Sequence, residues 1–207
     1  MGFDGARRQP LVFVLMKKQS LNEPTTIAAY VEAITRALEA RGVDPGEVLR
    51  EIDVSRIRNN DPLVRISDST VNAIYARAVA LTGDEYFGLS VAERIVPGML
   101  HALGYALLAS ETLEDFCHRF VRYYGLVSQS AHLRVFVEGD TFRLEADPHN
   151  PGICFETQDV WAGLVIRLMR AASRADFHPR QLDLRRPVPA GGEEPFRAFF
   201  GCPVRFG

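Results

Sequence analysis

Ser90 is the residue most like a catalytic nucleophile, in the stretch Gly88-Leu89-Ser90-Val91-Ala92. The stretch is close to the Gly-x-Ser-x-Gly signature, in which a serine on a sharp strand-to-helix turn attacks an acyl group. Alanine replaces the second glycine, and the surrounding residues have helical spacing. We therefore expect no serine hydrolase site.

Histidine and cysteine residues form no metal-binding pattern. Cys117 and His118 are neighbours in a helical segment, so their side chains point about 100° apart and cannot both face one metal from that turn. The sequence contains no Gly-x-Gly-x-x-Gly, P-loop or His-Glu-x-x-His motif. We expect no cofactor, no metal and no enzymatic activity. The cysteines are odd in number and widely spaced, which suggests a reducing, cytoplasmic setting: Cys117, Cys154 and Cys202.

Aromatic residues could instead line a ligand pocket, which needs apolar walls and a few polar groups. Arg134 and Arg143 are expected on opposing strands, where they could bind a carboxylate through paired hydrogen bonds. These arginines favour an amino acid or another carboxylate as the ligand. In the alternative interpretation the aromatic residues form the core and the arginines face solvent. The candidate pocket residues are Arg134, Arg143, Tyr105, Tyr124, Trp161 and Phe116.

Composition limits the possible partners. The 207 residues are 47% hydrophobic, enough for one sizeable core, and the net charge is -2. A nucleic-acid module usually carries an excess of basic residues that neutralise phosphates, so this chain is not expected to bind DNA itself. The apolar run from Leu11 to Met16 is far shorter than the ~20 residues that span a bilayer, and no membrane partner is expected.

Helical spacing dominates the first two thirds of the chain. A stripe runs from Ile27 to Leu38 and ends at Gly42, and Asp44-Pro45 marks the start of the next helix. Further helices are expected over 66–83, 85–95, 98–109 and 113–124, the last capped by Ser110.

At residue 131 the spacing changes from helical to alternating. Two strands on either side of Gly139-Asp140 predict a hairpin, followed by a long helix around Trp161, a strand at 182–184, a helix at 193–200 and a strand at 204–206. The order β-β-α-β-α-β after a helical half predicts an α+β fold with a small, mainly antiparallel sheet.

We expect residues 1–22 to form a flexible tail and residues 23–207 to form one domain. The last residues, Cys202 to Gly207, read as an apolar strand, which is an unusual natural terminus because strands need partners for their backbone groups. We therefore expect this chain to be part of a longer protein.

Three stretches together carry a resemblance to a known family. They are Tyr30 to Ile52, Gly98 to Tyr124 with the segment Gly-Tyr-Ala-Leu-Leu-Ala-Ser, and the final Phe-Phe-Gly-Cys-Pro-Val-Arg-Phe. Their order and spacing resemble the N-terminal effector-binding, arabinose-binding-type domain of AraC/XylS-family bacterial transcription regulators. Within the family, the chain is most similar to regulators of ornithine and arginine use. The resemblance covers roughly 26–207.

The resemblance implies a bacterial, cytoplasmic and commonly dimeric regulator. Its N-terminal domain would bind a small-molecule effector and control dimerisation, while DNA binding would belong to a C-terminal helix-turn-helix domain absent from this chain. Arabinose itself is not implied, and no binding residues carry over from the family.

Two other hypotheses remain open from the residues alone. The chain could be a constitutive dimerisation module without a ligand, its aromatic residues forming only core. A small-molecule enzyme has less support, because no nucleophile–base pair or metal set is visible.

Overall fold

The structure is a computed structural model that describes residues 23–50, 64–173 and 176–207. The prediction of a tail over 1–22 lies outside these residues. The first part of the fold consists of α-helices and short 3₁₀ helices, labelled η, with two short strands. Its elements are β1 (Thr25–Ile27), η1 (Ala28–Tyr30), α1 (Val31–Glu39), α2 (Pro45–Val48), β2 (Arg65–Ser67), α4 (Asp68–Thr82), α5 (Phe87–Ala92), η2 (Pro97–Leu100), α6 (Ala102–Leu108), α7 (Leu113–Tyr123) and η3 (Tyr124–Leu126).

The second part follows the predicted order β-β-α-β-α-β. Its elements are β3 (Ala131–Glu138), β4 (Thr141–Pro148), α8 (Phe155–Ala172), β5 (Leu182–Leu184), α9 (Glu194–Phe200) and β6 (Val204–Phe206). The hairpin register pairs Glu138 with Thr141 around Gly139, whose φ of 63° suits glycine in a two-residue turn. The prediction of an α+β fold is confirmed.

The strands do not form one sheet. Among the described residues, three separate two-stranded sheets are present: β1–β2 and β3–β4 are antiparallel, whereas β5–β6 is parallel. Neither β1 nor β2 was predicted, and the helix predictions are wrong where they overlap these strands, at Ile27 and at Ile66–Ser67. With three residues each, they are too short to show a period of two.

Several helix boundaries follow the local signals. The Asp44 carboxylate accepts a hydrogen bond from the Gly46 N–H (2.9 Å) at the start of α2. Ser67 caps α4 by accepting from the Thr70 N–H (3.3 Å), and Gly83 ends α4 with a φ of 64°. In contrast, α7 is capped by Thr112, which accepts from the Asp115 N–H (3.0 Å), and not by Ser110 as predicted.

The helix predicted over 98–109 is broken at His101. This residue has φ 51° and ψ -137°, an unfavourable conformation for a residue with a side chain, and it separates η2 from α6. The break lets α6 fold back onto η2 so closely that a Cβ on Gly104 would lie 1.9 Å from the Pro97 carbonyl oxygen. Only glycine permits this approach.

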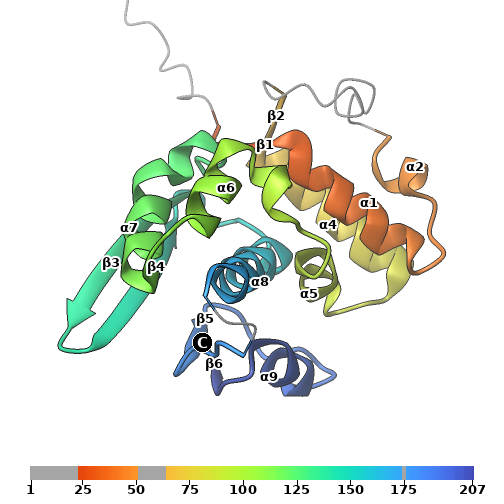
Figure 1. Ribbon diagram of the computed structural model, residues 1–207. Helices are drawn as coiled ribbons and strands as arrows, with labels where there is room; N and C mark the ends of the chain where they lie inside the picture. Colours follow the sequence, from red (N-terminus) through yellow and green to blue (C-terminus); the bar gives the residue numbers. More distant parts are fainter. Residues whose placement is uncertain (1–22, 51–63, 174–175) are drawn as a thin grey trace, which may run out of the picture.

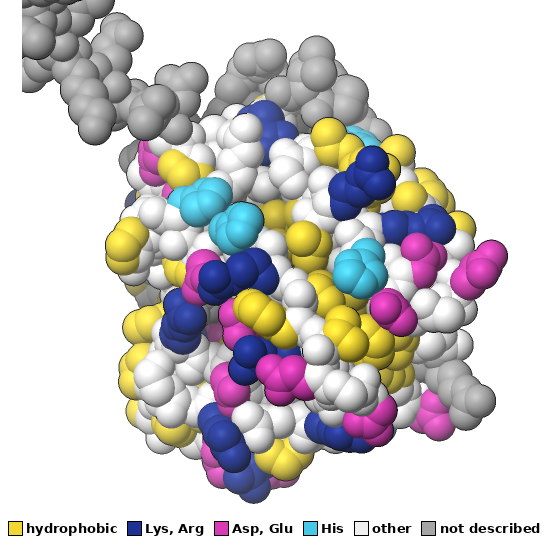
Figure 2. Space-filling model, turned by 90° about the vertical axis from the view of Figure 1, so that its left-hand side faces the viewer, with side chains coloured by type: hydrophobic (Ala, Val, Ile, Leu, Met, Phe, Trp, Pro, Cys, Tyr) yellow, Lys and Arg dark blue, Asp and Glu magenta, His cyan; other side chains and the backbone are white. Residues whose placement is uncertain are grey.

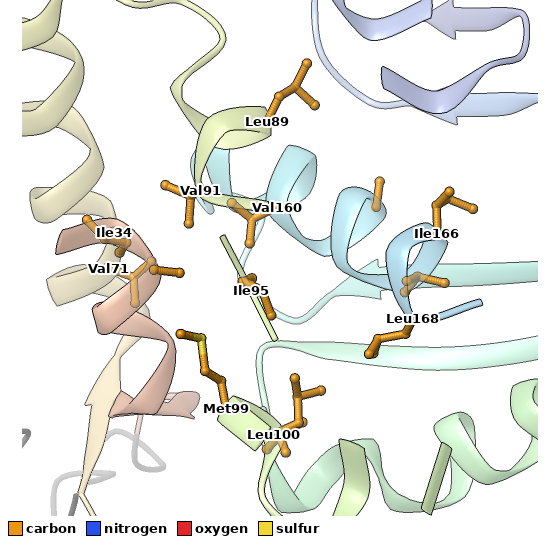
Figure 3. Packing of buried hydrophobic residues seen from close by; sticks show 14 of the residues in the cluster. Ile34, Val71, Leu89, Val91, Ile95, Met99, Leu100, Val160, Ile166 and Leu168 are labelled. Atoms are coloured by element: carbon orange, nitrogen blue, oxygen red, sulfur yellow. The ribbon is translucent and has the colours of Figure 1, made fainter. Parts of the chain in front are cut away.

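The helix α8 lies at the centre of the molecule, with α4, α5, α6, α7 and α9 packed against it (Figure 1). The β3–β4 hairpin runs beside α7 and extends away from the body, and the β5–α9–β6 segment lies on the opposite side of α8 from α6. Figure 3 shows apolar side chains from α1, α4, η2 and α8 meeting in one core, among them Ile34, Val71, Met99 and Val160.

Close contact between α5 and α8 depends on a glycine in each helix. A Cβ on Gly88 would lie 2.8 Å from the Asp159 Cβ and 2.8 Å from the Glu156 carbonyl oxygen. A Cβ on Gly163 would lie 2.5 Å from the Ala92 Cβ. These atoms belong to the backbone or lie next to it, so they cannot move aside as the end of a long side chain could.

We predict that Gly163→Ala lowers the free energy of unfolding by about 1–3 kcal/mol, because the added methyl overpacks the α5–α8 contact. The higher helix propensity of alanine, worth up to about 1 kcal/mol, acts in the opposite direction. Urea unfolding measures the difference. Gly125→Ala is the control, since its Cβ would meet no atom within 4 Å. Equal stability of the two variants would contradict the close fit.

A buried ion pair attaches the C-terminal segment to α8. Arg186 hydrogen-bonds to the Asp159 carboxylate, and both side chains are almost completely buried. The guanidinium carbon lies 5.3 Å from the ring centres of both Phe155 and Phe196. Burial raises the pKa of the Asp159 carboxyl, while the charge of Arg186 opposes that shift.

We predict that Arg186→Met costs about 3–5 kcal/mol of stability near neutral pH, because it leaves the Asp159 carboxylate buried without a cation. Its pKa would then rise further above the unfolded value of about 3.9. A carboxyl whose pKa is higher in the folded than in the unfolded chain destabilises the fold when the pH lies above both values, and this cost disappears at low pH. The stability lost in Arg186→Met should therefore shrink as the pH falls. Urea unfolding at pH 5 and pH 8 checks this, and a pH-independent loss would contradict it.

Candidate ligand-binding cavity

A cavity of about 90 Å³ lies where η1, the start of α4, η2, η3 and α8 meet. Its volume is several times the roughly 10–15 Å³ that one water requires. The apolar part of the wall includes Val71, Ile95, Met99 and Val160, which approach one another from α4, the segment before η2, η2 and α8 (Figure 3). The cavity therefore lies at the junction between the helical part and the elements that follow it.

The polar part of the wall is a cluster around Asp68, which has no exposed surface. The Ser130 hydroxyl donates a hydrogen bond to Oδ1 of Asp68. Thr26 Oγ1 lies 2.8 Å from Ser128 Oγ and 3.2 Å from Ser130 Oγ. The other carboxylate oxygen of Asp68, Oδ2, has no hydrogen-bond partner among the described residues.

Local structure explains why an aspartate lies at this point. Asp68 is the first residue of α4, directly after the cap Ser67, where the helix dipole favours a negative charge. Its N–H donates to the Pro24 carbonyl (3.1 Å), which fixes it beside the β1–β2 pair. Burial is the main cause that raises the pKa of the Asp68 carboxyl, and the hydrogen bond from Ser130 opposes it.

Two further polar atoms of the wall lack partners. The hydroxyl of Tyr75, a fully buried residue, and the indole Nε1 of Trp161 form no hydrogen bond of normal geometry with the described residues. The indole is still near enough to the Tyr124 hydroxyl to oppose the rise in its pKa, which burial brings to about 12. Burial also raises the pKa of Tyr30 and Tyr75. Buried polar groups without partners are rare in proteins, and here they line one cavity.

The structure brings together two of the six residues predicted for a pocket. Tyr124 and Trp161 line the cavity. Phe116 lies in the core without exposed surface, packed beside Phe120 with ring centres 6.2 Å apart. Tyr105 is 64% exposed on α6. Neither Phe116 nor Tyr105 lines the cavity.

The two predicted arginines lie on the exposed hairpin and not at the cavity. Arg134 pairs with Asp147 and with Glu145 (3.4 Å), while Arg143 pairs with Glu145 (3.2 Å) and Glu138 (3.6 Å). Both guanidinium groups also cover the Phe136 ring, at 5.7 and 4.8 Å from its centre. Ion pairs across the hairpin and along β4 thus account for the arginines within the hairpin itself.

Sequence reasoning missed the polar side of the cavity: Asp68, Ser130, Thr26, Tyr30 and Tyr75. Asp68 follows a capping serine, so its sequence context is that of an ordinary first-turn acid. Its burial depends on segments some sixty residues away, because Ser130 is 62 positions further along the chain. No local pattern carries that information.

Other kinds of site find no support in the described ranges. Within residues 23–50, 64–173 and 176–207, no group of three histidine, cysteine or acidic residues could hold a metal, and no helix is long and apolar enough to cross a membrane. The three cysteines are free thiols. Figure 2 shows basic and acidic side chains intermixed on the face that carries α7 and the hairpin, so that face has no continuous basic stripe for phosphates.

We predict that Ser130→Ala lowers the free energy of unfolding by about 1–3 kcal/mol, because it leaves the buried Asp68 carboxylate without its hydrogen-bond donor. Urea unfolding at pH 7 measures the loss. Ser69→Ala is the matched control: the Ser69 hydroxyl bonds to Glu23 (2.9 Å) and Ser67 (2.9 Å) in an exposed position, so its removal should cost less than that of the Ser130 hydroxyl. If both variants were equally stable, the polar cluster would not contribute to the fold.

Comparison with known proteins identifies the fold and the family. The crystal structure of the transcriptional regulator CdpR from Pseudomonas aeruginosa matches with a TM-score of 0.55 at 16% sequence identity, over 86% of this chain and 52% of that chain. The present chain thus spans about half the length of that regulator, and the likeness shows a shared fold. No curated protein matches the sequence. The family model described as "Arabinose-binding domain of AraC transcription regulator, N-term" matches residues 42–207, most of the chain, which therefore belongs to this family of regulatory, non-enzymatic domains.

Proposed function

We propose that this chain is the effector-sensing domain of an AraC-type transcription regulator and that a small metabolite binds in the cavity beside Asp68. The observation that carries the proposal is that the buried polar atoms Asp68 Oδ2 and Tyr75 OH, which lack hydrogen-bond partners among the described residues, belong to side chains that line one cavity. Leaving such a group unpaired costs about 1–3 kcal/mol. A ligand with complementary groups would recover this free energy.

The cavity lies next to an element that could respond to occupancy. Met99 and Leu100 of η2 form part of its wall, and η2 continues through His101 into α6. His101 has a strained backbone, which costs about 1–3 kcal/mol. A ligand that prefers one position of Met99 would therefore favour one arrangement of η2 relative to α6. The size of the response is limited by the ligand's differential affinity for the two arrangements.

The remaining parts of the proposal concern the full-length regulator. DNA contacts would be made by a helix-turn-helix domain outside this chain, in keeping with the net charge of -2. The regulator would act in the cytoplasm as a homodimer, whose arrangement the effector controls. Membership of the ornithine and arginine subfamily remains a prediction.

We predict that at least one compound of a metabolite library raises the melting temperature of the 207-residue chain, and that Leu164→Trp removes this shift. Leu164 lines the cavity from α8, so the larger indole would occupy the ligand's space. A ligand at 100 times its Kd should stabilise the chain by about 2.7 kcal/mol. Thermal unfolding with each compound measures the shift.

Leu81→Trp serves as the control, because Leu81 is an exposed leucine on α4, away from the cavity. It should keep the ligand-dependent shift of the unmodified chain. The proposal would be wrong if no compound stabilised the chain, or if Leu164→Trp retained the full shift.

A further inference from the structure

The charge of the cavity wall limits which ligands can enter. Among the described residues that line it, Asp68 is the single carboxylate, and no lysine, arginine or histidine takes part. None of the described cationic side chains forms an ion pair with Asp68. His149 acts on this carboxylate only at longer range, and its own Nδ1 is hydrogen-bonded to the Gln129 carbonyl (2.8 Å) in an exposed position.

Only one of the two carboxylate oxygens of Asp68 has a hydrogen-bond partner among the described residues. Oδ1 accepts from Ser130, whereas Oδ2 is buried and has no donor among the described residues, in a side chain that lines the cavity. Once ionised, this carboxylate only accepts hydrogen bonds, so a ligand that keeps it ionised would supply a donor to Oδ2. Charge-assisted hydrogen bonds are about twice as strong as neutral ones, which favours a cationic donor.

Aromatic rings surround the same space. Tyr30, Tyr75, Tyr124 and Trp161 all line the cavity. Burial is the main cause that raises the pKa of Tyr30 and of Tyr124, and the charge of Asp68 adds to it. Aromatic faces attract cations, most strongly where water is excluded. The aromatic rings and Asp68 therefore both favour a positively charged ligand.

We propose, on the basis of the sensing function above, that the effector is a small protonated amine with an apolar body, whose ammonium group donates a hydrogen bond to Oδ2 of Asp68. The N–H requirement favours primary and secondary amines over quaternary ammonium compounds. The apolar body would pack against Val71, Met99, Val160 and Leu164.

A carboxylate ligand is disfavoured by the same wall. Its charge would lie close to Asp68 in a site of low dielectric, where like charges repel strongly. Arg134 and Arg143 could not compensate, because they lie on the hairpin, where each pairs with acidic neighbours. The amine therefore replaces the carboxylate that the arginines alone suggested.

The test compares compounds with one butyl body and three head groups, n-butylamine, 1-butanol and pentanoate, together with the homologues of each that have C5 to C7 bodies. Isothermal titration of the 207-residue chain at pH 8 keeps the amines protonated, since alkyl amines resemble lysine with a pKa near 10.4. We expect the best amine to bind at least tenfold tighter than its alcohol, which corresponds to ~1.4 kcal/mol, and the carboxylates not to bind.

Asp68→Asn keeps the shape of the side chain and removes its charge. It should lower amine affinity at least tenfold and change alcohol affinity less than threefold. Asp140→Asn is the matched control, because Asp140 is an exposed aspartate at the hairpin turn, and it should bind amines like the unmodified chain. If Asp68→Asn does not fold, the order of the three head groups on the unmodified chain still decides the matter.

Tighter binding of an alcohol or a carboxylate, abolished by Leu164→Trp, would overturn the amine inference and leave the sensing function standing. Binding of none of the three series would also overturn it. In that case the library experiment would judge the sensing function separately, because its compounds include other chemical classes.

Discussion

The fold depends on how closely α5 and α8 approach each other. Gly88 and Gly163 permit this approach, since a Cβ on either would meet atoms at 2.8 or 2.5 Å. With α5 held so near, one face of α8 is covered, while Thr157, Val160, Trp161 and Leu164 are left to form a cavity wall. Asp159 holds the C-terminal segment through Arg186. A single helix thus supports the core, the cavity and the C-terminal segment, and a shift of α8 would affect all three.

The polar wall of the cavity is assembled from three distant parts of the chain. The β1 strand pairs with β2 on one side, and the Ile27 N–H donates to the Val127 carbonyl (2.8 Å) on the other, while the Gln129 N–H donates to the Thr25 carbonyl (2.9 Å). These bonds place Thr26 beside Ser128 and Ser130, and Ser130 in turn donates to Asp68. Satisfied polar networks fix one arrangement, whereas a half-satisfied one is costly. The unpartnered Oδ2 of Asp68 therefore does not stabilise the fold, which agrees with the ligand contact proposed above.

The sequence predicted those parts of the fold that local patterns encode. The hairpin around Gly139, the long helix α8 and the order of the last six elements follow from spacing and turn residues. The strands β1 and β2 could not be predicted, because three residues cannot show a period and their pairing joins distant segments. For the cavity, Tyr124 and Trp161 were identified as aromatic residues on apolar stripes, and both line it. Asp68 was missed, since burial of a first-turn acid results from tertiary contacts that no local signal reports.

The position of His101 bears on how occupancy could reach the rest of a regulator. A residue with φ 51° is held there by its surroundings, and Gly104 against the Pro97 carbonyl supplies much of that constraint. The His101 Nε2 is also buried without a partner among the described residues. A rearrangement that relaxed the backbone of His101 would recover the free energy stored in its strained conformation. Met99 and Leu100 line the cavity and lie two residues and one residue before His101, so a ligand in the proposed site would contact the chain next to it. Packed cores change between discrete arrangements more readily than they deform gradually. A switch at His101 would therefore move α6, and α7 packed against it, as a unit.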